Sequence, residues 1–416
     1  MRALIAGSTI LTLTLSSLAP LGVAQAAPTA PIPAATVVKT VRVDVDGNGK
    51  KDLVQLFHHG GNIFRLQVTT DKVTASDEFL SALPADGDWS NNLIWYGAAS
   101  LDGTKGAELI VHTYDADSWE NWDTPSRLGV YTWRSGHLVE ATAPKAPKTQ
   151  GWHLGTSDPY GINGYRFFTK SGRRYVEVAD LVDSQGNNHW SGKILRSVWK
   201  KRAWVKVSTR TVKLGEKSAG RYQTINGPSI LLGQARADID GDGRADAMTY
   251  RRLADDNIGS LGTWTLAVKT AKGIRRVIRL SPNSGDPLLG VAALDGVRGS
   301  EIIFTVDNES PLWKVYTWRK GKLVKESGPN MCGDSSKVWQ GCGDESSTGL
   351  DFSVVGSQHY LIVSSASPGE SHDVSYTKYL WRSGKWVKQS SWSAQLSEAD
   401  FAKRCSGFCG VALIDF

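Results

Sequence analysis

The sequence lacks a second long apolar run. Residues 3–18 form an apolar stretch after the single basic residue Arg2, and residues 24–26 (AQA) match a small-x-small cleavage signature. We therefore expect residues 1–26 to be a secretory signal peptide and residues 27–37 a flexible linker. The run is short of the ~20 residues that a membrane span needs, and no later stretch is apolar enough. These features predict a secreted protein without a membrane span.

Cysteine is also scarce. The chain has four cysteines, which fall into two close pairs, Cys332 with Cys342 and Cys405 with Cys409. No histidine stands beside either pair at the spacing of a zinc ligand, which argues against a zinc site. Because export favours disulfides, we expect each close pair to be joined.

Charge of one sign is not concentrated in any segment. The formal net charge of +7 and the pI near 9.1 suit an anionic partner such as an acidic glycan. The basic residues are scattered along expected strands, however, and the densest group, residues 200–202 (KKR), is typical of a hairpin turn. With no nucleic-acid-binding motif in the sequence, we expect no nucleic-acid partner.

Recognised catalytic motifs are missing as well. The sequence has no Gly-x-Ser-x-Gly elbow, no His-Glu-x-x-His helix and no phosphate-binding glycine loop. A carboxylate pair such as Asp117 and Glu120 can serve a glycosidase or a lyase, but the sequence does not fix the distance between them. We expect no catalytic residues and keep a secreted polysaccharide-acting enzyme as the alternative to a binding protein.

An internal repeat is the most informative feature present. Residues 44–52 (DVDGNGKKD) recur as residues 238–246 (DIDGDGRAD), and residues 99–108 (ASLDGTKGAE) recur as residues 292–301 (AALDGVRGSE). Residues 130–139 (VYTWRSGHLV) then recur as residues 315–324 (VYTWRKGKLV). The order of the matches is preserved, so the chain consists of two copies of one unit.

Each copy has the periodicity of β-strands. Residues 64–68 and 264–268 alternate apolar and polar side chains, and Ser-Gly pairs such as residues 135–136, 171–172 and 383–384 predict hairpin turns. Three strand-rich segments open in each copy, near these residues: Val41, Ala98, Gly164, Ala235, Val291 and Gly349. Segments of this size predict one β-propeller over residues 38–416 with six blades, or seven, and with halves 38–225 and 226–416. Two β-sandwich domains are the alternative.

The two Asp-rich segments have the spacing of a calcium loop. Oxygen-bearing residues stand at positions 1, 3, 5 and 9, a glycine stands at position 6, and the carbonyl of position 7 completes the set. The ligands expected in the two loops are Asp44, Asp46, Asn48, Lys50 and Asp52, and Asp238, Asp240, Asp242, Arg244 and Asp246. Calcium suits such a cage better than magnesium, which keeps more water. The alternative is an ordinary Asp/Gly-rich turn without metal.

An EF-hand begins with the same spacing but needs a glutamate at position 12 and flanking helices. Here position 12 is Gln55 or Thr249, and the flanks look like strands. A ninth-position Asp followed by a strand instead resembles the FG-GAP or VCBS repeat family, to which the integrin α-chain propellers belong. The resemblance is strong for residues 44–52 and 238–246, partial for the segments opening at Ser100 and Ala293, and implies a calcium-bearing propeller without implying an activity.

The second segment of each copy resembles the same loop with ligands removed. Alanine and valine stand at positions 293 and 297, where a metal loop needs side-chain oxygens. We therefore expect two calcium ions per chain and expect the degenerate loops to remain as turns. Three aspartates in nine residues repel one another until a cation binds, so we expect the calcium to be structural.

Tryptophan is abundant, with 16 residues. Those that recur in both copies, Trp133/Trp318, Trp199/Trp381 and Trp204/Trp386, are expected to pack between strands. Trp119 and Trp122 do not recur and stand among carboxylates. Aromatic rings beside carboxylates are typical of sugar-binding surfaces, so the residues expected to contact an extracellular glycan or protein ligand are Asp115, Asp117, Trp119, Glu120 and Trp122. We expect the protein to act as a monomer.

Overall fold

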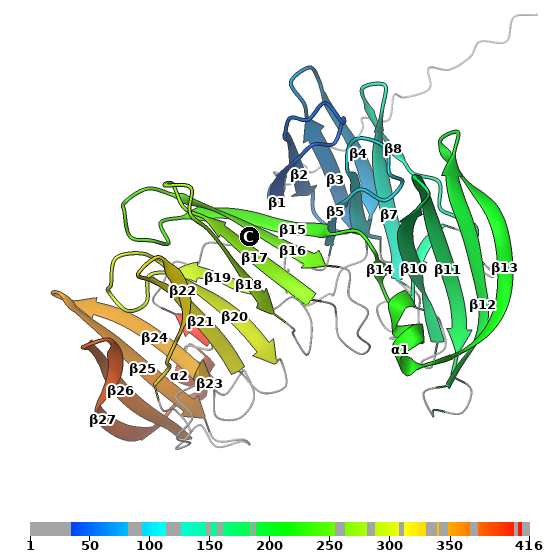
Figure 1. Ribbon diagram of the computed structural model, residues 1–416. Helices are drawn as coiled ribbons and strands as arrows, with labels where there is room; N and C mark the ends of the chain where they lie inside the picture. Colours follow the sequence, from blue (N-terminus) through cyan, green and yellow to red (C-terminus); the bar gives the residue numbers. More distant parts are fainter. Residues whose placement is uncertain are drawn as a thin grey trace, which may run out of the picture.

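The computed structural model describes residues 35–81, 94–113, 126–146, 151–155, 161–183, 186, 189–253, 263–280, 288–307, 312–329, 339–340, 348–366, 373–402 and 407–409. The expected signal peptide (1–26) and most of the expected linker (27–37) lie outside these residues. Strands dominate the described chain and form five sheets (Figure 1). The all-β class expected from the period-two alternation is confirmed.

Two of the sheets belong wholly to the first half of the chain. One has the order β1-β2-β3-β4, with β1 (Thr36–Val43), β2 (Asp52–His58), β3 (Ile63–Thr69) and β4 (Thr74–Leu80). The other has the order β13-β12-β11-β10-β14, with β10 (Gly161–Lys170), β11 (Arg173–Val182), β12 (His189–Lys200), β13 (Ala203–Gly215) and β14 (Ile225–Asn226). All of these pairings are antiparallel except that of β14 with β10.

Two further sheets belong to the second half. One contains β19 (Leu288–Ala292), β20 (Glu301–Asp307), β21 (Leu312–Arg319) and β22 (Lys322–Glu326) in that order, and β23 (Trp339–Gln340) pairs with β21. The other has the order β27-β26-β25-β24-β28, with β24 (Thr348–Val355), β25 (Gln358–Ala366), β26 (Asp373–Arg382), β27 (Lys385–Gln395) and β28 (Gly407–Cys409). Only β28 runs parallel to its neighbour.

The fifth sheet joins the two halves. Its first-half strands are β5 (Trp95–Ala99), β6 (Glu108–His112), β7 (Ser126–Arg134), β8 (His137–Glu140) and β9 (Trp152–Leu154). Its second-half strands are β15 (Ile230–Ala237), β16 (Asp246–Leu253), β17 (Thr263–Lys269) and β18 (Arg275–Leu280). The two groups meet where Leu231 of β15 pairs with Ala98 of β5, and the indole N–H of Trp95 donates to the carbonyl of Leu232 (3.0 Å).

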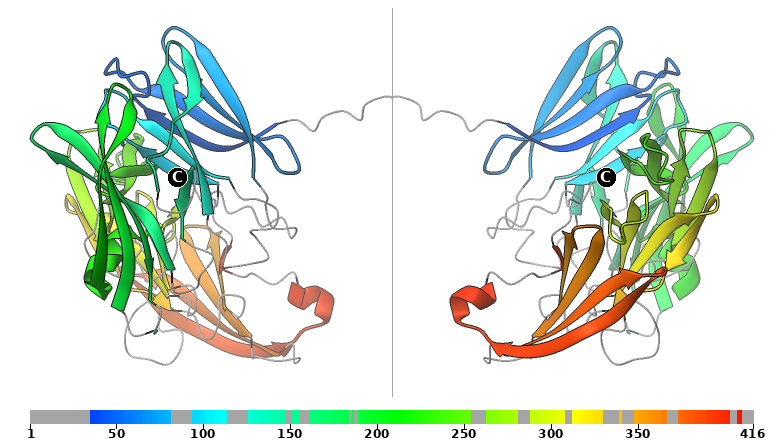
Figure 2. Two further views of the ribbon diagram at one scale, coloured as in Figure 1. Left: turned by 90° about the vertical axis from the view of Figure 1, so that its right-hand side faces the viewer. Right: turned by 90° about the vertical axis from the view of Figure 1, so that its left-hand side faces the viewer.

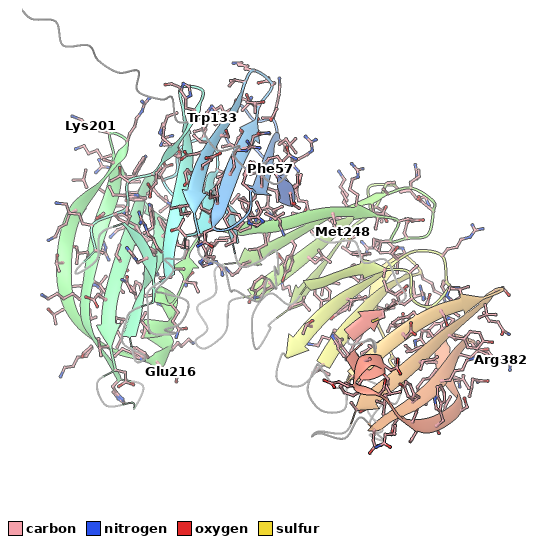
Figure 3. All side chains as sticks on the ribbon, turned by 180° about the vertical axis from the view of Figure 1, so that it is seen from behind. Phe57, Trp133, Lys201, Glu216, Met248 and Arg382 are labelled. Carbon is pink, nitrogen blue, oxygen red and sulfur yellow. The ribbon has the colours of Figure 1, made fainter. Side chains whose placement is uncertain are left out.

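The hairpin turns expected from Ser-Gly pairs are present. Ser135 and Gly136 both have positive φ (48° and 87°), as the tight two-residue turns that match strand twist require. The turns at residues 171–172 and 383–384 have the same conformation, and so do Lys201 and Arg202 (52° and 61°), within the expected basic hairpin. Figure 3 shows Lys201 at the tip of the β12–β13 hairpin and Glu216 at the opposite end of β13.

The apolar faces of the strands form the core between sheets. In β3, Phe64, Leu66 and Val68 are buried, and in β17 the alternating positions Trp264 and Leu266 are buried in the same way. One cluster unites side chains of β1–β4 with those of β5–β8, and another unites the two sheets built from β19–β23 and β24–β28. The sheets therefore pack on one another through their faces.

Recurrent tryptophans pair across the hairpins. Trp199 and Trp204 lie with ring centroids 5.0 Å apart, and Trp381 and Trp386 lie 5.1 Å apart at nearly the same interplanar angle, 59° against 60°. Each pair flanks a two-residue turn, so the same cross-strand packing closes both hairpins. The expectation that these residues pack between strands is confirmed.

The five sheets are open: none of them closes on itself among the described strands. The first-half sheets lie on one side of the molecule and the second-half sheets on the other, with β15 reaching between them (Figure 1). Open antiparallel sheets packed face to face fit the alternative expectation of two β-sandwich domains. The closed ring of six blades stays a prediction.

Within the part of the chain that the structure describes, helical structure is confined to short segments. They are α1 (Glu216–Ala219), the 3-10 turn η2 (Gly220–Tyr222) and α2 (Glu398–Ala402), which follows β27 at the edge of the molecule (Figure 2). Within the described residues, no helix has the length and apolar character needed to cross a membrane.

Candidate metal centres

The first acidic loop joins β1 to β2 and is closed by backbone N–H groups that point at its aspartates. Asp44 accepts hydrogen bonds from the amides of Gly47 (2.8 Å) and Gly49 (2.9 Å). Asp52, the first residue of β2, is 3% exposed and accepts from the amide of Val45 (2.7 Å). The aspartates are thus fixed in place by the loop that carries them.

These bonds leave three carboxylates close together. Asp44, Asp46 and Asp52 each offer an oxygen, and these oxygens lie within 4.8 Å of one another. Two oxygens that bind one calcium ion at about 2.3–2.6 Å stand no more than about 5 Å apart, so the spacing suits a single ion. The side-chain oxygen of Asn48 accepts the amide of Lys50 (2.7 Å).

The second acidic loop joins β15 to β16 and repeats this pattern. Asp238 accepts from the amides of Gly241 (2.8 Å) and Gly243 (2.8 Å), and fully buried Asp246 accepts from the amide of Ile239 (2.9 Å). Asp238, Asp240 and Asp246 again offer oxygens within 4.8 Å of one another. Two segments separated by nearly half the chain therefore build the same carboxylate arrangement.

Asp242 has a different environment from these three aspartates. Its carboxylate pairs with Arg244 (2.9 Å) and Lys272 (3.3 Å), and the hydrogen bond from Arg244 is the main reason that its pKa falls to about 2. Asp242 lies outside the group of three carboxylates. The atom of Arg244 expected to bind calcium is its backbone carbonyl oxygen. The ion pair between the Arg244 side chain and Asp242 leaves that oxygen available.

The crowding of carboxylates affects their ionisation. Burial raises the pKa of Asp52, and the charges of Asp46 and Asp44 raise it further. Burial and the charge of Asp246 raise the pKa of Asp240 in the second loop. A divalent cation between the carboxylates would relieve this repulsion.

The degenerate loops pack directly against the acidic loops. The amide of Ala107 donates to the carbonyl of Asp44 (2.9 Å), and the amide of Ser300 donates to the carbonyl of Asp238 (2.8 Å). A Cβ added to Gly106 would lie 2.4 Å from the carbonyl oxygen of Val45, so only glycine permits this approach. The degenerate loops are turns, as expected. Their backbone hydrogen bonds also hold the adjacent acidic loops in position.

In each degenerate loop, an arginine pairs with the aspartate. Arg134 pairs with Asp102 (3.3 Å) in the first copy, and Arg319 pairs with Asp295 in the second. The buried Glu108 accepts from the amide of Leu101 (2.7 Å), as the ninth-position aspartate does in an acidic loop. Both arginines stand in the repeated TWR segment, and this recurrence is the sequence signal for their shared role.

A second ionic cluster lies in the sheet of β10–β13. Glu177 is fully buried and accepts hydrogen bonds from Arg196 (2.6 Å) and from the hydroxyl of Tyr222 (2.7 Å). Arg166 pairs with the same carboxylate (3.3 Å), and its guanidinium lies over the ring of Phe168. The cluster joins η2 to the sheet and is not among the sites expected from the sequence.

The remaining expected site residues lie mostly outside the described part of the chain. This holds for the whole candidate ligand surface, Asp115, Asp117, Trp119, Glu120 and Trp122, and for Cys332, Cys342 and Cys405. Cys409 is described and is disulfide-bonded. The pairing of the cysteines stays a prediction.

Comparison with known proteins identifies no family. No family model matches the chain, and no curated protein matches it. Solved structures align over most of the chain but with low similarity. AofleA from Arthrobotrys oligospora has 9% identity, covers 86% of this chain and 87% of its own, and gives a TM-score of 0.22. A hypothetical selenium-binding protein from Sulfolobus tokodaii has 9% identity over 83% and 76% of the two chains, with a TM-score of 0.23.

Proposed function

We propose that the protein is an exported, calcium-stabilised β protein that binds an extracellular glycan or protein surface and is not an enzyme. The observation that carries the proposal is the pair of acidic loops, each with three fixed carboxylates spaced for one ion. The resemblance of residues 44–52 and 238–246 to the FG-GAP or VCBS repeats supports calcium binding. The binding role rests on analogy with that family and on the lack of a recognised catalytic motif in the sequence.

The donor set of each loop fits calcium. Asp44, Asp46 and Asp52 supply hard carboxylate oxygens, and the bend at Gly49, with φ of 83°, closes the loop around them. The carbonyl of Lys50 would complete the set. Calcium bound there would join the start of β2 to the β1–β2 loop, so its role in this proposal is structural.

We extend the proposal to the architecture: the two halves form one cooperative body, as a six-bladed propeller requires. The pairing of Leu231 with Ala98 and the burial of Trp95 beneath β15 support it. Residues 36–228 expressed alone lack β15 and expose this edge of β5. We expect this half to aggregate or dimerise in size-exclusion chromatography. A monomer that melts cooperatively would instead favour two β-sandwich domains.

The candidate ligand surface rests on the sequence alone. Trp119 and Trp122 among carboxylates supply flat apolar faces and hydrogen-bond acceptors, the combination that a sugar ring needs. The net charge of +7 would favour encounter with acidic glycans.

The test of the binding function is a glycan array probed with the mature protein, with calcium and with chelator, while release of products from bound glycans is followed. We expect calcium-dependent binding without turnover, and at least a tenfold loss of affinity in the double variant Trp119→Ala/Trp122→Ala. Trp392→Ala, which removes an exposed tryptophan on β27, is the control. Turnover would support the alternative of a polysaccharide-acting enzyme, and binding unaffected by the double variant would place the ligand elsewhere.

A further inference from the structure

A third group of carboxylates lies buried in the sheet of β19–β23, where the sequence predicts only a degenerate loop. Asp295, Glu301 and Glu326 are 1%, 1% and 5% exposed, and each offers an oxygen within 4.8 Å of the others. Both acidic loops are more open, because two of the three carboxylates in each are only partly buried. This third group is therefore the most deeply buried of the three.

Two of its members already have partners. Asp295 accepts the amide of Val297 (2.7 Å) and pairs with Arg319. Glu301 accepts the amide of Leu294 (2.8 Å) and the hydroxyl of Thr317 (2.9 Å). These contacts repeat those of the degenerate loop in the first copy, where Asp102 pairs with Arg134 and Glu108 accepts the amide of Leu101.

Glu326 is different. Neither of its carboxylate oxygens has a hydrogen-bond partner in the described part of the chain, although both are buried. The indole N–H of Trp386 lies near enough to lower the pKa of Glu326, but burial and the charge of Glu301 dominate. An unpartnered buried carboxylate is costly unless a proton or a cation compensates its charge.

The first copy provides an internal comparison. Glu326 stands opposite Val315 at the end of β22, and Ala141 occupies the equivalent place, where its amide donates to the carbonyl of Val130 (2.6 Å). In the first copy, Arg134 pairs with Asp102, and the charge of Arg174 acts on both Asp102 and Glu108. In the described part of the second copy, a third carboxylate joins the group, and Arg319 is the arginine that pairs with it. Ionised, the group around Arg319 carries two uncompensated negative charges.

We propose that Asp295, Glu301 and Glu326 together bind a third divalent cation, of the calcium class that takes carboxylate oxygens. The separations of their oxygens are those that one ion at about 2.3–2.6 Å permits. A charge of +2 cancels the surplus around Arg319, and the free oxygens of Glu326 become ligands. The ion would join the end of β22 to the start of β20 within one sheet.

The test is calcium titration of the full mature chain by calorimetry, followed by equilibrium dialysis. We expect three bound ions in the natural protein and one in the double variant Asp46→Ala/Asp240→Ala, which disables both acidic loops. Adding Glu326→Gln should remove this last ion, whereas adding Glu140→Gln, an exposed glutamate at the end of β8, should not.

Other outcomes separate this inference from the proposed function. A natural protein that binds two ions, both lost in the double variant, would overturn the third site and leave the acidic loops standing. Calcium binding that is lost in Glu326→Gln but kept in the double variant would support the third site and overturn the acidic loops as calcium sites. Glu326→Gln removes only a charge and keeps the shape of the side chain, and a cooperative melt confirms that the variant is folded. A melting temperature raised by this variant, with no change in bound calcium, would show that Glu326 holds a proton and not an ion.

Discussion

Glu177→Ala is expected to lower the free energy of unfolding by about 3 kcal/mol, the low end of the range for breaking a buried ion pair. The carboxylate is fully buried and is held by Arg196, Arg166 and the hydroxyl of Tyr222. The loss stays at the low end because the arginines are partly exposed and can regain water when the carboxylate is removed. Urea denaturation followed by tryptophan fluorescence measures the change.

Two further variants measure the part of this loss that comes from one hydrogen bond and the effect of removing an exposed glutamate. Tyr222→Phe removes one hydrogen bond to a charged acceptor and should cost about 1.5–3 kcal/mol, while the exposed Glu78→Ala should stay within about 0.5 kcal/mol of the natural protein. A Glu177 variant as stable as the Glu78 variant would show that the cluster contributes nothing to folding.

The same cluster should be sensitive to acid. Burial alone would raise the pKa of Glu177, but the hydrogen bonds from Tyr222 and Arg196 outweigh it, and the pKa lies below its ordinary value. A depressed folded-state pKa contributes stability above the unfolded pKa and loses it as the pH falls through the folded pKa. Unfolding at pH 7 and at pH 3 should therefore differ less in Glu177→Gln than in the natural protein.

Local features of the fold were predictable because short-range patterns determine them. Alternation placed the strands at residues 64–68 and 264–268, and the Ser-Gly pairs fixed the hairpins that bring Trp381 onto Trp386. Such turns also fix the register: Arg166 and Glu177 lie opposite one another because they are equally far from the turn at residues 171–172. That ion pair could therefore have been predicted from the turn.

Long-range features were not accessible in this way. The strand pairing that joins the two halves has one registered pair, Leu231 with Ala98, which no local period encodes. The third acidic group depends on the end of β22 reaching back to the β19–β20 loop, and a glutamate at position 326 looks like any strand-end charge in sequence. The repeat could show that Arg319 recurs, but only the fold shows that its guanidinium neutralises Asp295.

Removal of calcium is expected to have the largest effect on the whole protein. An ion at a hundredfold excess over its dissociation constant adds about 2.7 kcal/mol per site if only the folded state binds it, so two acidic loops together contribute about 5 kcal/mol. Without the ion, Asp44, Asp46 and Asp52 repel one another at the junction of β1 and β2. Chelator should therefore lower the melting temperature by several degrees, as measured by calorimetry in buffers of equal ionic strength.

Loop variants locate this effect. Asp46→Ala and Asp240→Ala should each remove the part of the calcium-dependent shift that comes from its own loop, and the double variant should keep only the part that comes from the third ion, because each loop holds its own ion. Asp71→Asn is the matched control: Asp71 pairs with Lys50 (2.8 Å) beside the first loop but lies outside the group of three carboxylates, so its calcium response should be that of the natural protein. A double variant that keeps the full calcium-dependent shift would exclude the acidic loops as the sites, and equal melting with and without chelator would show that both loops are ordinary turns.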